Sequence, residues 1–217
     1  MNASRIASTL VVMTTLGLII AAAPPVGYAV PRLDEFESWP APDALVQSGT
    51  LSFTGHSTFG DFVGTTTAVS GGVSGSADVA NVRGWVEATV ASLSTRNSHR
   101  DSDLRSSMEV AKYPTMRFDL AGFSGQSAAV PPDTVTGRLR GTLTIHGVTR
   151  DVTINATLFA AADTIDVSGA FPLDLADYRI GGLTRLFGTL RMQRNIEVRF
   201  HLRFQATPHT TARGSEQ

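Results

Sequence analysis

The sequence contains no cysteine, which excludes disulfide bonds, thiolate metal ligands and a cysteine nucleophile. Neither sign of charge dominates, because 18 lysines and arginines stand against 19 acidic residues. Nucleic-acid-binding domains usually carry a strongly basic face, so we expect no nucleic-acid partner. An apolar stretch from Leu10 to Ala23 is shorter than the roughly 20 residues of a membrane-spanning helix.

Residues 1–29 have the layout of a secretory signal peptide. Arg5 precedes the apolar stretch, and small residues follow it as far as Ala29. We expect cleavage after Ala29, with Ala23 as the alternative, and no integral membrane span after cleavage. An uncleaved membrane anchor is the competing interpretation. The pattern predicts a protein that is secreted or periplasmic.

The rest of the chain suits one globular domain. Residues 30–48 contain prolines and an acidic run, and we expect a lead-in or linker there. The domain itself is expected over residues 49–206. Residues 207–217 have the composition of a disordered tail.

From Gly49 onward, apolar and polar residues alternate with a period of two, most clearly over residues 135–145 and 196–204. Successive side chains of a strand point to opposite faces, so each such segment has one apolar and one polar side. Weaker alternation occurs over residues 50–55, 62–69, 85–93, 116–123, 152–159 and 164–171. The pattern predicts an all-β fold of about eight antiparallel strands, with turns at residues 146–150 and 162–163.

Glycines inside the strands favour closure into an eight-stranded barrel. Gly137 and Gly141 lie on the alternating apolar face, and glycine in a strand interior often marks a bend at a barrel corner. A barrel of this size holds packed side chains or one slender ligand. A β-sandwich is the main alternative. A membrane-embedded barrel would carry girdles of aromatic residues, and the chain has only 2 tryptophans and 3 tyrosines.

The charged stretch over residues 95–120 could in principle form a catalytic site or a metal-binding site. His99, Arg100 and Asp101 imitate the catalytic loop of protein kinases, but Ser106 replaces the required asparagine. His99, Asp101 and Asp103 are possible metal ligands by type, although a spacing of two residues splays side chains apart on a helix. We therefore expect no catalytic residue and no metal site here.

The same stretch is better explained by one short helix between Ser98 and Ala111. Ser98 is the expected N-cap, and Leu104, Met108 and Ala111 fall on one apolar face. Pro114 prevents the helix from continuing. The charges then form the solvated face of a helix that lies across the mouth of the barrel as a lid.

Two stretches resemble the YceI-like family. One is TRNSHRDSDLRSSMEVAKYPTMRF, residues 95–118, and the other is VTGRLRGTLTIHGVTRDVTI, residues 135–154. Residues 52–64 and 174–182 look like a divergent branch of the same family. The resemblance covers roughly residues 49–204. It implies a lipocalin-like antiparallel β-barrel that holds a long isoprenoid chain in its bore, without catalysis and without a cofactor.

The expected function is therefore that of a non-catalytic secreted lipid-binding protein. The expected ligand is an isoprenoid, polyprenyl or quinone-like, or another long-chain apolar lipid. An apolar bore gains about 25 cal/mol per Å² of apolar surface that it removes from water. The candidate bore residues, which would equally fill a collapsed core, are Phe53, Val86, Phe118, Leu139, Leu143, Val198, Phe200 and Leu202. The head-group candidates are Arg100, Arg105 and Arg179. The alternative is an interaction or adhesion module whose filled barrel presents loops to a protein partner. Homodimerisation stays open.

Overall fold

The computed structural model describes residues 43–75, 81–127, 134–161, 163–181, 184–185 and 190–207. These residues belong to one compact unit, Trp39–Gln217. The expected signal peptide, most of the expected lead-in, and residues 208–217 of the expected tail lie outside the described residues. Ala162, in one of the two expected turns, lies outside them as well. No helix among the described residues is long and apolar enough to cross a membrane.

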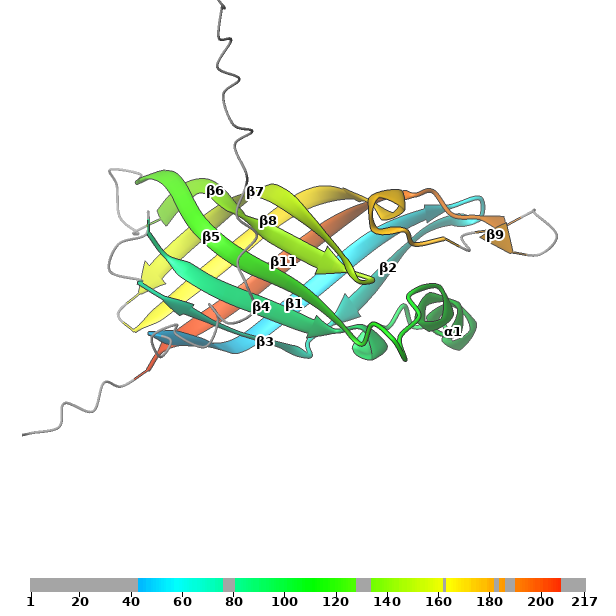
Figure 1. Cartoon of the computed structure of the whole chain (residues 1–217), viewed down its shortest axis with the longest axis horizontal. Helices are drawn as coiled ribbons and strands as arrows, with labels where there is room; N and C mark the ends of the chain where they lie inside the picture. The colour runs from blue at the N-terminus through cyan, green and yellow to red at the C-terminus, as the bar shows by residue number, and fades with distance from the viewer. Residues whose placement is uncertain are drawn as a thin grey trace, which may run out of the picture. The chain divides into compact units, whose positions relative to one another are not determined.

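The fold is a closed antiparallel β-barrel (Figure 1). The strands run in the order β11-β8-β7-β6-β5-β4-β3-β1-β2, and an additional pairing of β1 with β11 closes the ring. Their bounds are β1 Ala44–Ser57, β2 Gly60–Thr66, β3 Val69–Ser74, β4 Arg83–Thr89, β5 Thr115–Ser127, β6 Thr134–Ile145, β7 Val148–Ala161, β8 Thr164–Asp174 and β11 Asn195–Ala206. β9 (Thr184–Arg185) and β10 (Leu190–Arg191) form a separate two-stranded sheet.

The strands β2 and β3 share one place in the ring. β2 pairs with the second half of β1, from Leu51 to Ser57, whereas β3 pairs with its start at Ala44 and Leu45. Nine strands therefore occupy eight places around the barrel. The eight-stranded barrel expected from the sequence is confirmed, and the sandwich alternative is wrong. Closure pairs the strand edges that an open sheet would expose.

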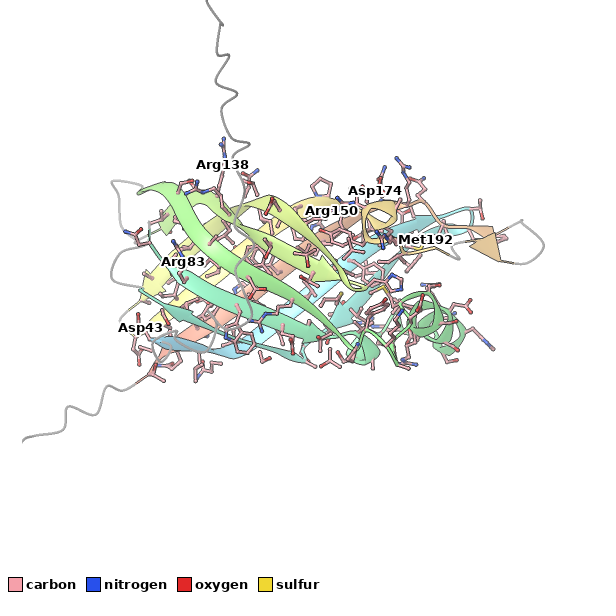
Figure 2. The ribbon with its side chains drawn as sticks, in the orientation of Figure 1. Asp43, Arg83, Arg138, Arg150, Asp174 and Met192 are labelled. Carbon is pink, nitrogen blue, oxygen red and sulfur yellow. The ribbon has the colours of Figure 1, made fainter. Side chains whose placement is uncertain are left out.

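The period-two alternation sorts side chains between the bore and the outside. Along β6, Leu139, Leu143 and Ile145 are buried, whereas Arg138 and Arg140 are exposed. Arg138 projects from the outer surface (Figure 2). Burial of the apolar side gives the main favourable free energy, and the alternation fixes the register because a one-residue slip would exchange the two faces.

Several strand boundaries differ from the sequence-based expectation, most of all at the start of the barrel. β1 begins at Ala44, so the last five residues of the expected lead-in belong to the barrel. The strand expected over residues 62–69 ends at Thr66, whose hydroxyl accepts a hydrogen bond from the backbone N–H of Ala68 and turns the chain. The strand expected over residues 85–93 ends at Thr89, followed by the 3₁₀ helix η2 (Val90–Ser92). β3 was not expected, because its glycines hide the alternation.

The turn between β6 and β7 is shorter than expected. Ile145 pairs with Val148, which leaves only His146 and Gly147 in the turn. Their φ angles are 52° and 71°, and positive φ at both central residues is the geometry that continues the twist of two antiparallel strands. The remaining residues of the expected turn, 148–150, already belong to β7.

Replacing Gly147 with alanine is expected to lower the free energy of unfolding by about 2–4 kcal/mol, measured by denaturant unfolding. Its φ is positive, and a Cβ atom would lie 2.5 Å from Cε1 of Tyr113. Gly60→Ala is the matched control, because Gly60 also has a positive φ but its new methyl group would meet no atom within 4 Å. The control should lose about 1–2 kcal/mol. Equal losses in both variants would show that the contact with Tyr113 contributes nothing.

The helix α1 spans Ser98–Ser107, and its N-cap is Asn97 where Ser98 was expected. The side-chain oxygen of Asn97 accepts a hydrogen bond from the backbone N–H of Arg100 at 3.1 Å. Leu104 and Met108 pack against the hydrophobic core as expected. Ala111, expected on the same face, lies beyond the helix and is exposed.

Candidate functional site

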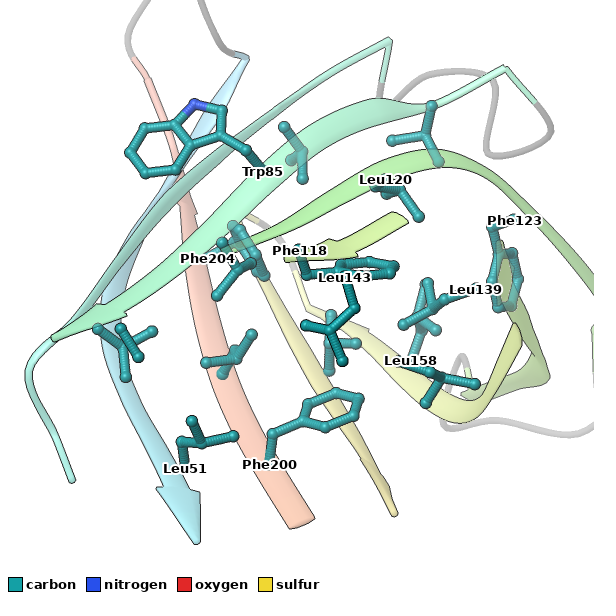
Figure 3. Close-up of a pocket in the computed structure, with 18 of the residues that line it drawn as sticks. Leu51, Trp85, Phe118, Leu120, Phe123, Leu139, Leu143, Leu158, Phe200 and Phe204 are labelled. Carbon is teal, nitrogen blue, oxygen red and sulfur yellow. The ribbon is translucent and has the colours of Figure 1, made fainter. Parts of the chain in front are cut away.

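An apolar cavity of about 170 Å³ lies inside the barrel (Figure 3). Every residue that lines it is hydrophobic. Phe118, Leu139 and Phe200 contribute from three different strands, and buried Phe123 and Phe204 lie in the half of the barrel farther from α1. We refer to this space as the inner cavity. With a wall made of hydrophobic side chains alone, it suits the end of an apolar chain.

A larger cavity of about 960 Å³ lies at the end of the barrel that α1 covers, and we refer to it as the mouth cavity. Its wall is apolar on the barrel side, where Phe53 and Val198 contribute. On the side of α1 it carries polar side chains beside the apolar Leu104 and Met108. The polar residues from this segment are Asn97, His99, Arg100, Ser102, Asp103 and Ser107. The cavity is therefore amphipathic, and much of its polar part comes from the helix.

Glycines keep phenylalanine rings flat against the barrel wall around the cavities. Phe53 lies opposite Gly64 on the neighbouring strand, and a Cβ atom at Gly64 would overlap its ring. Gly169 likewise lies opposite Phe200 on the neighbouring strand, and a Cβ atom added at Gly169 would lie 2.7 Å from the Phe200 ring. A side chain at either glycine would force the ring away from the wall, toward the bore. The missing side chains thus preserve cavity volume.

The eight candidate bore residues all line the two cavities. Val86, Phe118, Leu139, Phe200 and Leu202 line the inner cavity. Phe53 and Val198 line the mouth cavity, and Leu143 lines both. Their contact with a ligand stays a prediction.

Of the three head-group candidates, the structure places Arg100 at the mouth cavity. Its guanidinium carbon lies 4.2 Å from the centre of the Phe62 ring, a cation–π contact on the rim. Arg105 instead donates from Nε to the carbonyl oxygen of Ala91 at 3.3 Å, and Arg179 is exposed beyond η3 (Leu175–Tyr178). Neither Arg105 nor Arg179 lines the mouth cavity.

Asp101 is not part of a solvated face, contrary to expectation. It is buried, with 7% of its surface exposed. One carboxylate oxygen accepts hydrogen bonds from the backbone N–H and the hydroxyl of Thr95, at 2.7 and 2.6 Å, and the other accepts from the Ser94 hydroxyl at 3.1 Å. The hydrogen bond from the Thr95 hydroxyl holds the pKa of Asp101 below its usual value, against the opposing effect of burial. Asp101 thus ties α1 to the segment that precedes it.

The metal-binding interpretation of this stretch finds no matching geometry. The carboxylate of Asp101 is engaged by Thr95 and Ser94, which lie N-terminal to the helix. Within the part of the chain that the structure describes, no three histidine, aspartate or glutamate side chains are grouped so as to hold a metal ion.

Sequence reasoning missed a cluster of side chains around the β6–β7 turn. His146, in the β6–β7 turn, is buried, and its Nδ1–H donates to the carbonyl oxygen of Tyr178 in η3 at 3.2 Å. Its Nε2 lies 3.2 Å from a carboxylate oxygen of Glu109, and its ring meets the Tyr113 ring edge-on at 4.6 Å between centres. Burial raises the pKa of Tyr178. The cluster joins the turn, η3 and the segment after α1, three parts that are far apart in sequence.

η3 also supplies apolar lining that the alternation pattern missed. The period-two pattern of β8 was expected to end at residue 171, yet Leu173, Leu175 and Ile180 continue the wall of the mouth cavity. The side chain of Asp174 accepts a hydrogen bond from the N–H of Ala176 at 3.0 Å and so caps η3. The signal was present as leucines at positions 173 and 175, which extend the alternation of β8 by two steps.

Among solved structures, a polyisoprenoid binding domain from Saccharophagus degradans, implicated in plant cell wall breakdown, is similar to this chain. The two share 16% identity with a TM-score of 0.66, over 77% of this chain and 100% of that chain. Burkholderia cenocepacia BcnA shares 18% identity with a TM-score of 0.59, over 71% of this chain and 95% of that chain. A Campylobacter jejuni YCEI protein shares 21% identity with a TM-score of 0.53, over 67% and 85%. At these identities the similarity shows a common fold.

No curated protein matches the sequence. The family model described as the YceI-like domain matches residues 45–204, which include β1 almost from its start and β11 almost to its end. The match therefore spans the whole closed barrel together with α1 and both cavities. On this evidence the chain belongs to the YceI-like domain family.

Proposed function

We propose that this protein is an exported, non-catalytic lipid-binding protein that encloses a long isoprenoid-type chain in its barrel. The observation that carries the proposal is the pair of adjoining cavities, of which the inner one is lined by hydrophobic residues alone. The Saccharophagus degradans structure, described as a polyisoprenoid binding domain, supports the same class of ligand. The volume of the mouth cavity favours ligand binding over a filled barrel that only presents loops.

The energetics of such a site depend mainly on burial. Each Å² of apolar ligand surface removed from water gains about 25 cal/mol, so an enclosed chain binds with few polar contacts. Binding sites of about 300–1,000 Å³ that are mostly apolar, with a few orienting polar groups, are typical for organic ligands. The mouth cavity fits this description, because the polar groups of α1 face an apolar wall.

The charges at the mouth favour a head group without net charge. Arg100 is accompanied on the cavity wall by two acidic residues, Asp61 and Asp103. A phosphate carries roughly −1.5 to −2 charges at neutral pH and is repelled by neighbouring carboxylates. A polyprenyl alcohol or a quinone-like head group has hydrogen-bonding oxygens without this repulsion. We therefore favour polyprenyl alcohols and quinone-like molecules over prenyl phosphates as the ligand.

Intact-mass measurement of the full chain, expressed with export and purified without detergent, tests both parts of the proposal. Export with cleavage after Ala29 predicts a polypeptide that begins at Val30. A non-covalent extra mass that dissolves in organic solvent, present at one per chain, is the expected ligand, and its mass identifies the head group. A polypeptide that keeps residues 1–29 would overturn the proposal of an exported protein with a cleaved signal peptide. A polypeptide without added mass that also fails to bind added prenyl lipids would overturn the lipid-binding proposal.

A further inference from the structure

The two cavities meet at a ring of four side chains. Leu51, Met116, Leu143 and Phe171 each line both the inner cavity and the mouth cavity. They come from four different strands, β1, β5, β6 and β8, and so surround the bore at one level. We call these four residues the belt.

The hydrophobic core consists of two clusters, one around each cavity. One hydrophobic cluster, which includes Leu143, Ile145 and Val198, lies toward α1. A second cluster, which includes Phe123 and Leu139, surrounds the inner cavity. The ring of Phe171 packs against both clusters, so it lies at the boundary between them.

The inner cavity is small compared with the mouth cavity. At about 170 Å³ it is close to the 150 Å³ of an engineered protein cavity that binds benzene, and so it accommodates roughly one five-carbon isoprene unit. Phe123 and Phe204, 2% and 4% exposed, lie on its wall in the half of the barrel farther from α1. A chain that enters from the mouth therefore has little room beyond the belt.

We propose that the belt sets how deeply an isoprenoid chain enters the barrel, and thereby the chain length that the protein binds best. This inference rests on the proposed lipid-binding function. The terminal unit of the chain passes between Phe171 and Leu51 and fills the inner cavity, while the remaining units and the head group occupy the mouth cavity. Units beyond this length remain in solvent and add no affinity.

Substitutions at Phe171 and Leu51 change the width of the passage through the belt in opposite directions. Phe171→Ala removes a phenyl ring from the boundary and adds roughly the volume of one benzene-sized group to the inner cavity. Leu51→Phe adds a ring at the same level and narrows the passage. Phe159→Ala is the matched control, because Phe159 lies on the outer face of β7, is 36% exposed and lines neither cavity.

The test measures dissociation constants of the full chain, freed of lipid, for all-trans prenyl alcohols of increasing length, from roughly two to six isoprene units. In the unchanged protein, each added unit should tighten binding about tenfold until the affinity stops rising. Phe171→Ala should move this plateau about one unit longer, and Leu51→Phe about one unit shorter. Phe159→Ala should leave it unchanged.

The outcomes separate this inference from the proposed function. If no prenyl alcohol binds to any of the proteins, the lipid-binding function itself is wrong. If all bind but share one plateau, or if the plateaus shift in the reverse directions, the belt does not set chain length. Thermal unfolding of each variant shows whether it is folded, and Phe171→Leu, which keeps more of the packing, replaces Phe171→Ala if the latter is not.

Discussion

Replacing Asp101 with alanine is expected to lower the free energy of unfolding by about 3–5 kcal/mol. The carboxylate accepts two short hydrogen bonds from Thr95, which is itself buried with 7% of its surface exposed. A buried hydrogen bond to a charged group contributes about 1.5–3 kcal/mol, and alanine leaves both donors of Thr95 without a partner. Ser94 is exposed, so its hydroxyl regains water and adds little. Denaturant unfolding of the two proteins at neutral pH measures the difference.

Asp101→Asn is the matched variant, because its amide oxygen still accepts from Thr95 while the charge is lost. We expect about half the loss of the alanine variant. A loss below about 1 kcal/mol for alanine would show that the segment before α1 rearranges to satisfy Thr95 in another way.

The same carboxylate makes stability depend on pH in the acid range. The pKa of Asp101 is lowered in the folded protein from a usual value of 3.8, chiefly by the hydroxyl of Thr95. Its contribution is therefore fully present above this usual value and is lost as the pH falls from there through the lowered folded-state pKa. The difference in stability between the natural protein and Asp101→Asn should shrink over that range. Asp166, whose pKa is lowered by its hydrogen bond from Arg203, titrates in both proteins and cancels in the difference.

The barrel was predictable because its information is local. The alternation along each strand indicates which side chains face inward. Because the barrel is closed, the inward-facing side chains of all strands line a single bore. Leu139, Leu143 and Phe200 are assigned to the bore on that basis alone, and they line the cavities. The resemblance to the YceI-like family implied the extent of the domain and its barrel fold, and the family match over residues 45–204 confirms that membership.

The details of the site depend on relations between strands that no single stretch reveals. Whether Phe53 fills the bore or lies flat against its wall is decided by Gly64, which faces it from the neighbouring strand. That relation follows from the register, which the sequence does not state. The burial of Asp101 was missed for a similar reason, because charge pattern suggests a solvated helix face, whereas Thr95 supplies donors from outside the helix.

Removing the proposed isoprenoid ligand is expected to lower the melting temperature by about 8–16 °C. A ligand that binds only the folded state stabilises it by about 4.1 kcal/mol when its free concentration is a thousand times the dissociation constant. For a domain of roughly 150–250 residues, each kcal/mol changes the melting temperature by about 2–4 °C. The effect is large here because an empty bore leaves the apolar walls of both cavities without a packing partner.

The measurement compares the purified protein before lipid extraction, after extraction, and after reloading with the extracted lipid. Each tenfold increase in free lipid should add about 1.4 kcal/mol, so the melting temperature should rise steadily with lipid concentration. Asp101→Asn is the comparison variant, because Asp101 itself lines neither cavity, and it should show the same rise from a lower starting value. A melting temperature that is independent of lipid in both proteins would mean that the cavities bind no lipid in the folded state. A rise in the natural protein but not in Asp101→Asn would mean that lipid binding depends on the seating of α1, which forms part of the wall of the mouth cavity.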